Sequence, residues 1–185
     1  MPTVQRGRSV TWFRTCDSRF PFLWTGGGQP PARWHGEGEG PVQYLADTPD
    51  GAWAEFVRHE ELVDAADLAG VQRHLWSVEV PAGSEIVHQP SLDQSQLLGG
   101  FESHAACREE ARRLRAKGAT AIQAPSAALL PGAARGQRVS RGLVEAEKRD
   151  GRVLALFGRR PRLRGWLCAE SGRPAARLLG LVRFP

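Results

Sequence analysis

Alternation of apolar and polar side chains predicts several short strands along this chain. The clearest run extends from Ser9 to Arg14 and reads S-V-T-W-F-R, in which aromatic and β-branched residues alternate with polar ones. Glycine and proline punctuate the chain between such runs, as in the P-A-G-S turn that follows residue 80. Further strands or strand-like segments are predicted at 41–46, 75–80, 85–88, 119–124, 142–146, 153–157, 166–169 and 178–184.

Two segments carry the caps of helices. Thr48 has the character of an N-cap with Pro49 at the first helical position, which predicts a helix of about three turns up to His59. Ser103 is expected to cap a second helix that has basic residues in its last turn and ends at Gly118. Because the strands are many and do not alternate regularly with helices, the pattern predicts an α+β fold.

The length and composition fit one globular domain over residues 1–185. A chain of 185 residues can bury a continuous core without disulfides, and its residues are 41% hydrophobic and 24% charged. No apolar run approaches the ~18 residues of a membrane span, and the N-terminal segment lacks the apolar stretch of a secretory signal. We therefore expect a cytoplasmic protein without membrane contact.

Neither a disulfide framework nor a metal site is predicted. Cys16, Cys107 and Cys168 are odd in number, far apart and without the spacing of metal ligands. The five histidines form no motif such as H-E-x-x-H.

Charge is distributed unevenly between the two halves of the chain. Residues 1–100 carry 7 basic and 13 acidic side chains, whereas residues 101–185 carry 18 and 7. A basic half is typical of a protein with an anionic ligand or partner. However, 23 of the 25 basic residues are arginine, a bias that coding composition can produce, so direct nucleic-acid binding is not expected from this signal.

Polar residues recur at the ends of the predicted elements. Arg14 closes the first strand, Glu55 lies on the first helix, and Ser126 follows Pro125 at the end of a strand. A loop over 25–41, rich in glycine and proline, contains the string A-R-W-H-G and has backbone room to approach a ligand.

Taken in order, these residues resemble the RES domain, a family named for its Arg, Glu and Ser. The resemblance covers about residues 10–157 and leaves 158–185 as a C-terminal β-rich extension. One departure is that Pro31-Ala32 replaces the two glycines that often precede R-W in the family, which leaves the aim of Arg33 open. The residues that carry the resemblance are Arg14, Arg33-Trp34-His35 with Gly36, Tyr44, Glu55 and Pro125-Ser126.

The resemblance implies a fold similar to that of ADP-ribosyltransferases, with antiparallel sheets around a dinucleotide cleft. Family members act as toxins of RES/Xre-type toxin–antitoxin systems, which degrade NAD+ and are restrained by a DNA-binding antitoxin that covers the active site. NAD+ is then the substrate, inorganic phosphate is a candidate co-substrate, and no resident cofactor is expected. A homo-oligomer is an open alternative.

Each residue type suits one part of NAD+. Arg14 and Arg33 can bind pyrophosphate oxygens through paired hydrogen bonds, and Tyr44 with Trp34 can wall the nicotinamide or ribose. Glu55 can stabilise the ribosyl cation, and Ser126 can hold a ribose or phosphate oxygen. The catalytic candidates are Arg14, Glu55 and Ser126.

A plainer alternative exists for every one of these residues. Arg14 and Arg33 can form surface ion pairs, Trp34 and Tyr44 can pack in the core, and Ser126 can stabilise its own turn. On an ideal helical wheel Glu55 lies about 200° from Trp53, so it can also be a solvated carboxylate opposite the apolar stripe.

The leading hypothesis is an NAD+ glycohydrolase or phosphorylase that cleaves the bond between nicotinamide and ribose. A second hypothesis is transfer of ADP-ribose to a macromolecule. A third is a non-catalytic module that binds nucleic acid through the arginine-rich half, with an affinity that falls steeply as salt rises.

Overall fold

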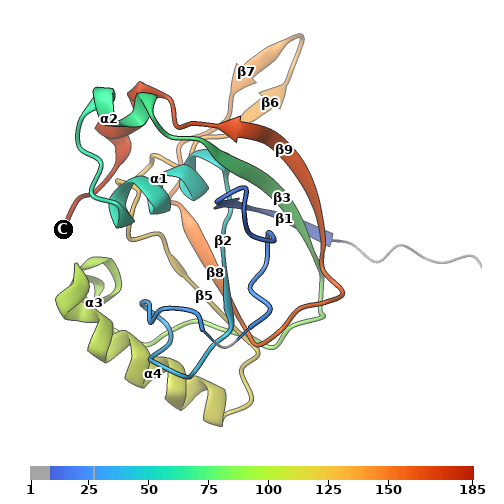
Figure 1. Cartoon of the computed structure of the whole chain (residues 1–185), viewed down its shortest axis with the longest axis vertical. Coiled ribbons are helices and arrows are strands. Elements are labelled where there is room, and N and C mark those ends of the chain that lie inside the picture. Colours follow the sequence, from blue (N-terminus) through green and yellow to red (C-terminus); the bar gives the residue numbers. More distant parts are fainter. Residues whose placement is uncertain (1–8, 27) are drawn as a thin grey trace, which may run out of the picture.

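A seven-stranded sheet organises the computed structural model, which describes residues 9–26 and 28–185 (Figure 1). The strand order is β4-β5-β8-β2-β1-β3-β9, and only β4 and β5 pair in parallel. A separate hairpin, β6 (Gln137–Val139) with β7 (Leu143–Glu145), projects from the body. The sheet contains β1 (Ser9–Cys16), β2 (Val42–Ala46), β3 (Arg73–Pro81), β4 (Val87–His88), β5 (Ala121–Pro125), β8 (Arg152–Phe157) and β9 (Arg164–Gly172). The predicted α+β class is confirmed.

The first predicted helix begins and ends where its sequence indicates. The Thr48 hydroxyl accepts a hydrogen bond of 2.9 Å from the backbone N–H of Gly51, and Pro49 occupies the first turn. The remaining helical elements include short ones that periodicity does not reveal. The helices are α1 (Pro49–His59), α2 (Ala65–Ala69), α3 (Gln94–Leu98) and α4 (His104–Ala116), with the 3-10 turns η1 (Phe101–Ser103) and η2 (Ala176–Leu181).

Two local predictions are wrong. Ser103 does not cap α4 through its side chain, because its hydroxyl donates to the carbonyl of Gly100 within the preceding 3-10 turn. The segment 178–184 is mainly the 3-10 turn η2 instead of a strand, since a short apolar run is compatible with either and here Leu178 and Val182 are buried against α1. Residues 158–185 therefore add one strand, β9, to the edge of the main sheet.

Helices cover one face of the sheet in two places. The α4 helix packs through Cys107, Ala111 and Leu114 on side chains of β2, β5 and β8, while α1 packs through Trp53 and Val57 on a second cluster that includes η2. In Figure 1 the two helices lie apart over the sheet, with the loop between β1 and β2 in the same region as α4.

The sheet is nearly divided between β1 and β2. These strands are in register at one position, Phe13 opposite Ala46, whereas β1 pairs with β3 at eight positions and β2 with β8 at five. Since Ala46 is the last residue of β2, the two strands diverge along the part of β2 that precedes it. Arg14 and Tyr44 lie beside the divergence.

Candidate active site

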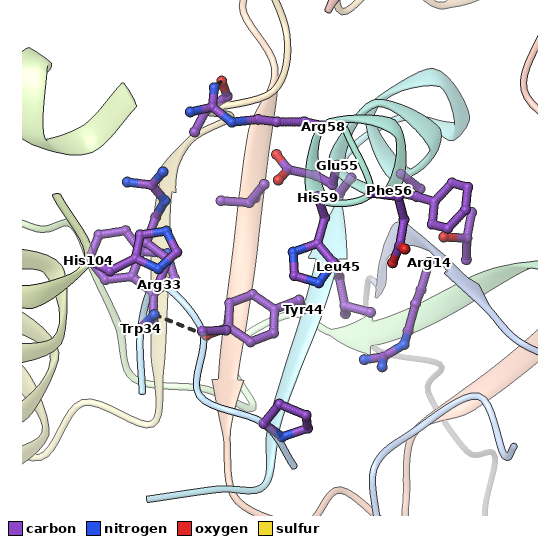
Figure 2. Close-up of a pocket in the computed structure, with 18 of the residues that line it drawn as sticks. Arg14, Arg33, Trp34, Tyr44, Leu45, Glu55, Phe56, Arg58, His59 and His104 are labelled. Carbon is purple, nitrogen blue, oxygen red and sulfur yellow. Dashed lines mark hydrogen bonds between the residues drawn. The ribbon is translucent and has the colours of Figure 1, made fainter. Parts of the chain in front are cut away.

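A cavity of about 420 Å³ opens where β1 and β2 diverge. Its walls come from these two strands, α1, the segment 29–34, the turn before α4 and the end of β5. Five of the six predicted site residues line it, and Figure 2 shows how their side chains are arranged: Arg14, Arg33, Trp34, Tyr44 and Glu55. The sixth, Ser126, is not in the lining but forms a hydrogen bond with Glu55.

Glu55 and Ser126 form a hydrogen-bonded pair. The Ser126 hydroxyl donates to Oε1 of Glu55 at 2.7 Å, and its oxygen lies 3.2 Å and 3.3 Å from the backbone N–H groups of Ala128 and Leu129, which donate to it. Since both acceptor positions of the hydroxyl are used by these donors, its proton is directed to the carboxylate. Ser126 thus orients Glu55 and is poorly placed as a covalent nucleophile.

The protein environment of Glu55 favours the protonated, neutral form of its carboxyl group more than water would. Burial raises the pKa of Glu55, while the Ser126 hydroxyl and the nearby Arg33 and Arg58 oppose this rise by stabilising the carboxylate. A carboxylate held in this way can act on a cationic ligand without being fully hydrated.

Glu55 is not the solvated helix carboxylate that the helical wheel allowed. The face of α1 opposite Trp53 is covered by the strand end at 125–128, the loop at 98–101 and the C-terminal segment, which Arg58 ties together. A wheel describes one helix only, and it cannot show that loops from elsewhere in the chain close over its polar face.

Arg58 is the residue that closes this face, and it is only 8% exposed. Its guanidinium donates to the carbonyls of Ala127, Arg183 at 3.0 Å, Leu98 at 3.2 Å and Gly99 at 2.6 Å. Sequence reasoning missed it. The available signal was its position three residues after Glu55, which puts both on one helix face.

Arg33 is largely engaged by the protein itself. It donates to the carbonyls of Gly99 at 2.6 Å and Gln96 at 3.1 Å, and to the Ser103 hydroxyl at 2.9 Å. Arg33 and Arg58 therefore share the Gly99 carbonyl from two sides. This arrangement favours a structural role for Arg33 over the predicted contact with pyrophosphate.

Arg14 is placed differently from Arg33. Its Nε and Nη1 are buried and have no hydrogen-bond partner among the residues that the structure describes. Burial lowers the pKa of Arg14 to about 10, with the neighbouring Arg73 adding to the effect, so the group remains charged at neutral pH. A buried guanidinium with free donors is suited to an anionic ligand.

Tyr44 of β2 links residues 33–35, the R-W-H segment, to the sheet through hydrogen bonds of its hydroxyl group. Its hydroxyl accepts from the backbone N–H of Trp34 at 3.0 Å and lies 2.9 Å from Nδ1 of His35. Burial raises the pKa of Tyr44, so the phenol is neutral and its ring faces the cavity between Arg14 and Arg33 in Figure 2. The Trp34 side chain is 1% exposed and belongs to the core under α4. This position agrees with the alternative that Trp34 packs in the core.

Two histidines also line the cavity, and sequence reasoning gave neither a role. Burial lowers the pKa of His104 to about 4, and the nearby Arg33, Arg108 and Arg58 contribute in the same direction. His104 is therefore neutral at pH 7. His59, from the last turn of α1, lies between Glu55 and Tyr44 in Figure 2.

Two further findings concern metal ligands and membrane spans. Within 9–26 and 28–185, no three His, Cys, Asp or Glu side chains gather closely enough to hold a metal ion. The helices in those ranges include none with the length and apolarity needed to cross a bilayer. What the cavity does contain is a carboxylate opposite aromatic and cationic walls, which suits a ligand with one cationic and one anionic part.

Comparisons with known proteins identify the family of this chain. A family model of the RES domain matches residues 11–164. A chain of the M. tuberculosis MbcT–MbcA toxin–antitoxin complex has a similar fold, with a TM-score of 0.58 and 17% sequence identity over 94% of this chain and 88% of that one. Among curated proteins none matches. Because the matched family model spans most of its length, this chain belongs to the RES domain family.

Proposed function

We propose that this protein is an NAD+-consuming enzyme that cleaves the bond between nicotinamide and ribose. The observation that carries the proposal is the partly buried Glu55 carboxylate, oriented by Ser126. It faces the same cavity as the Arg14 guanidinium, whose Nε and Nη1 have no hydrogen-bond partner among the residues that the structure describes. NAD+ offers a cationic nicotinamide ring for the first group and a diphosphate for the second.

The reaction needs one carboxylate. The C1′–N1 bond breaks and its electron pair passes to the nicotinamide nitrogen, so nicotinamide leaves neutral and requires no proton. Positive charge develops on the ribose, where Glu55 stabilises it. An oxygen of water or inorganic phosphate then bonds to C1′, and a water nucleophile gives up a proton to the solvent.

Nicotinamide release tests the proposal. Purified protein is incubated with NAD+, with and without inorganic phosphate, and free nicotinamide is followed over time. We expect release by the wild type and a loss of at least 100-fold, about 2.7 kcal/mol of transition-state stabilisation, in Glu55→Gln. The matched control is Glu109→Gln, an exposed glutamate on α4 that should leave release unchanged.

Three outcomes are informative. No release by the wild type, or unchanged release by Glu55→Gln, would overturn the proposal. ADP-ribose-1-phosphate formed only with phosphate would identify a phosphorylase, and ADP-ribose alone a glycohydrolase. Label from NAD+ retained on a macromolecule would instead show ADP-ribosyl transfer.

The biological role that we propose is that of a toxin with a cognate DNA-binding antitoxin. Membership of the RES family supports it, and so does the fold shared with a chain from a toxin–antitoxin complex. Expression of the chain should arrest cell growth and lower cellular NAD+, whereas Glu55→Gln should do neither. Growth arrest with unchanged NAD+ would contradict the assignment.

A further inference from the structure

A second cavity, of about 430 Å³, adjoins the first. The two cavities share four lining residues, which are Arg14, Thr15, Trp24 and Arg73. Glu55 lines only the first cavity, and the exposed Phe20 lines only the second. Together they form one elongated site with the shared residues at its middle.

Two arginines without acidic partners occupy this middle. Arg14 extends from β1 and Arg73 from the start of β3, and the Nε atoms of both are buried without a hydrogen-bond partner in the described parts of the chain. Neither guanidinium lies within 4.0 Å of a carboxylate there. Arg73 is held in place by Phe56, whose ring centre is 4.4 Å from its guanidinium carbon.

The arginines on the other side of the first cavity differ in this respect. Arg33 and Arg58 each donate to several backbone carbonyls, and Arg108 donates from Nε to the carbonyl of Ala32 at 2.9 Å. The donors of these arginines are therefore used by carbonyl groups of the protein itself. Arg14 and Arg73 place two like charges together with free donors, which is costly unless an anion binds between them.

We propose that Arg14 and Arg73 together bind the diphosphate of NAD+, and that the second cavity receives the adenosine half of the molecule. This inference rests on the proposed function, and it replaces Arg33 by Arg73 as the second diphosphate ligand. The volume of the second cavity lies within the ~300–1,000 Å³ of typical ligand sites. Trp24, which is 36% exposed, offers an aromatic face for the adenine base.

One acid lines the second cavity and must be considered. Asp17 is bound by its neighbour Arg19, which donates to its carboxylate at 2.8 Å and 3.0 Å. These bonds lower the pKa of Asp17 and pair its charge. Asp17 therefore does not cancel the positive charge of the two arginines.

Calorimetric titration with ADP, AMP and inorganic pyrophosphate tests the inference without any bond cleavage. The full-length wild type should bind ADP at least tenfold more tightly than AMP, because only a diphosphate engages both guanidinium groups. Arg73→Met keeps the apolar stem over Phe56 and removes the charge. It should weaken ADP and pyrophosphate about 10- to 100-fold.

Matched variants separate the two parts of the inference. Trp24→Ala should weaken ADP by about tenfold and leave pyrophosphate unchanged, since only ADP carries a base. Arg164→Ala, an exposed arginine on β9, should change neither, and thermal unfolding of each variant checks its fold. Unchanged ADP binding in a folded Arg73→Met would overturn the diphosphate assignment, and equal loss of ADP and pyrophosphate in Trp24→Ala would overturn the adenosine assignment.

Failure of this inference is distinguishable from failure of the proposed function. If the wild type releases nicotinamide but Arg73→Met binds ADP normally, the function stands and the subsite is wrong. If ADP binds as expected but no nicotinamide is released, the subsite stands and the chemistry is wrong.

Discussion

Ser126 shows how one hydroxyl group can set the chemistry of a carboxylate. Its acceptor positions are filled by two backbone N–H groups, so its single proton goes to Glu55. From the sequence, a serine after a proline at a strand end is equally consistent with an ordinary turn residue. Only the fold shows that its partner is Glu55, 71 positions earlier in the chain.

Replacing Ser126 by alanine should change the pH dependence of nicotinamide release. The hydrogen bond stabilises the ionised carboxylate and lowers the pKa of Glu55, so its loss should raise that pKa further. In the proposed reaction the ionised form is the active one, so the acid limb of kcat/KM should move to higher pH in Ser126→Ala. An acid limb that stays in place would show that Ser126 does not act through Glu55.

Glu55 should also weaken the fold at neutral pH. Since burial raises its pKa in the folded state, its contribution to stability is largest below the ordinary glutamate pKa and is lost as pH rises through the raised value. Glu55→Gln cannot ionise. The Tm of this variant should therefore exceed that of the wild type by an amount that grows with pH. The expected difference is about 2–4 °C for each 1 kcal/mol by which the free energy of unfolding increases.

Thermal scans of both proteins from pH 4 to pH 8 check this expectation, and the difference between them isolates Glu55 from other titrating groups. A Tm difference that stays constant across this range would contradict it.

At the scale of elements, the sequence predicts the ends and the apolar face of α1 correctly but does not reveal what covers its polar face. Its cap, its ends and its apolar stripe follow from Thr48, Pro49 and the spacing of Trp53 and Val57. Its polar face is enclosed as well, because the loop at 98–101 and the C-terminal segment fold over it. Contacts between segments so distant in the chain leave no periodic signal.

The need for a periodic signal also explains which strands and helices could be predicted from the sequence. Strands with clear alternation, such as β1 and β3, were predicted within a few residues, whereas the five-residue helices α2 and α3 are too short to show a period. Motif order identified five residues that line the candidate cavity. Arg58, Arg73 and His104 were missed because each acquires its role from tertiary neighbours.

Arg58 should be the most sensitive position of α1. Arg58→Met keeps much of the apolar stem but leaves buried carbonyls of three segments without a donor, so the free energy of unfolding should fall by about 2–4 kcal/mol. Urea denaturation measures the change. Arg112→Met, at an exposed ion pair of α4 with Glu39, should cost at most about 1 kcal/mol, and an equal cost at both sites would contradict the proposed clamp.

At the scale of the whole molecule, the cavity exists because the sheet is nearly divided. The position of Phe13 opposite Ala46 is the one place where β1 and β2 are in register, so N–H groups of β1 that point toward β2 lack a continuous partner strand. Those that point toward β3 meet a partner along the full strand.

Hydrogen exchange should report this division. Along β1 we expect alternate amides to be protected, because successive N–H groups point to opposite neighbours. The amides that face β2 should exchange early and slow down when ADP is bound. Uniform protection along β1, measured by NMR, would contradict the expected pattern.

The near-division of the sheet has a mechanical consequence. The strands β4, β5, β8 and β2 form one leaf and β1, β3 and β9 form another, and a single rung joins them. A small rotation of one leaf about the Phe13–Ala46 rung would change the width of the cavity without breaking another strand pair, but α1, which packs on both leaves, would have to move as well. We therefore expect the contacts of α1 with both leaves to set the width of the cavity.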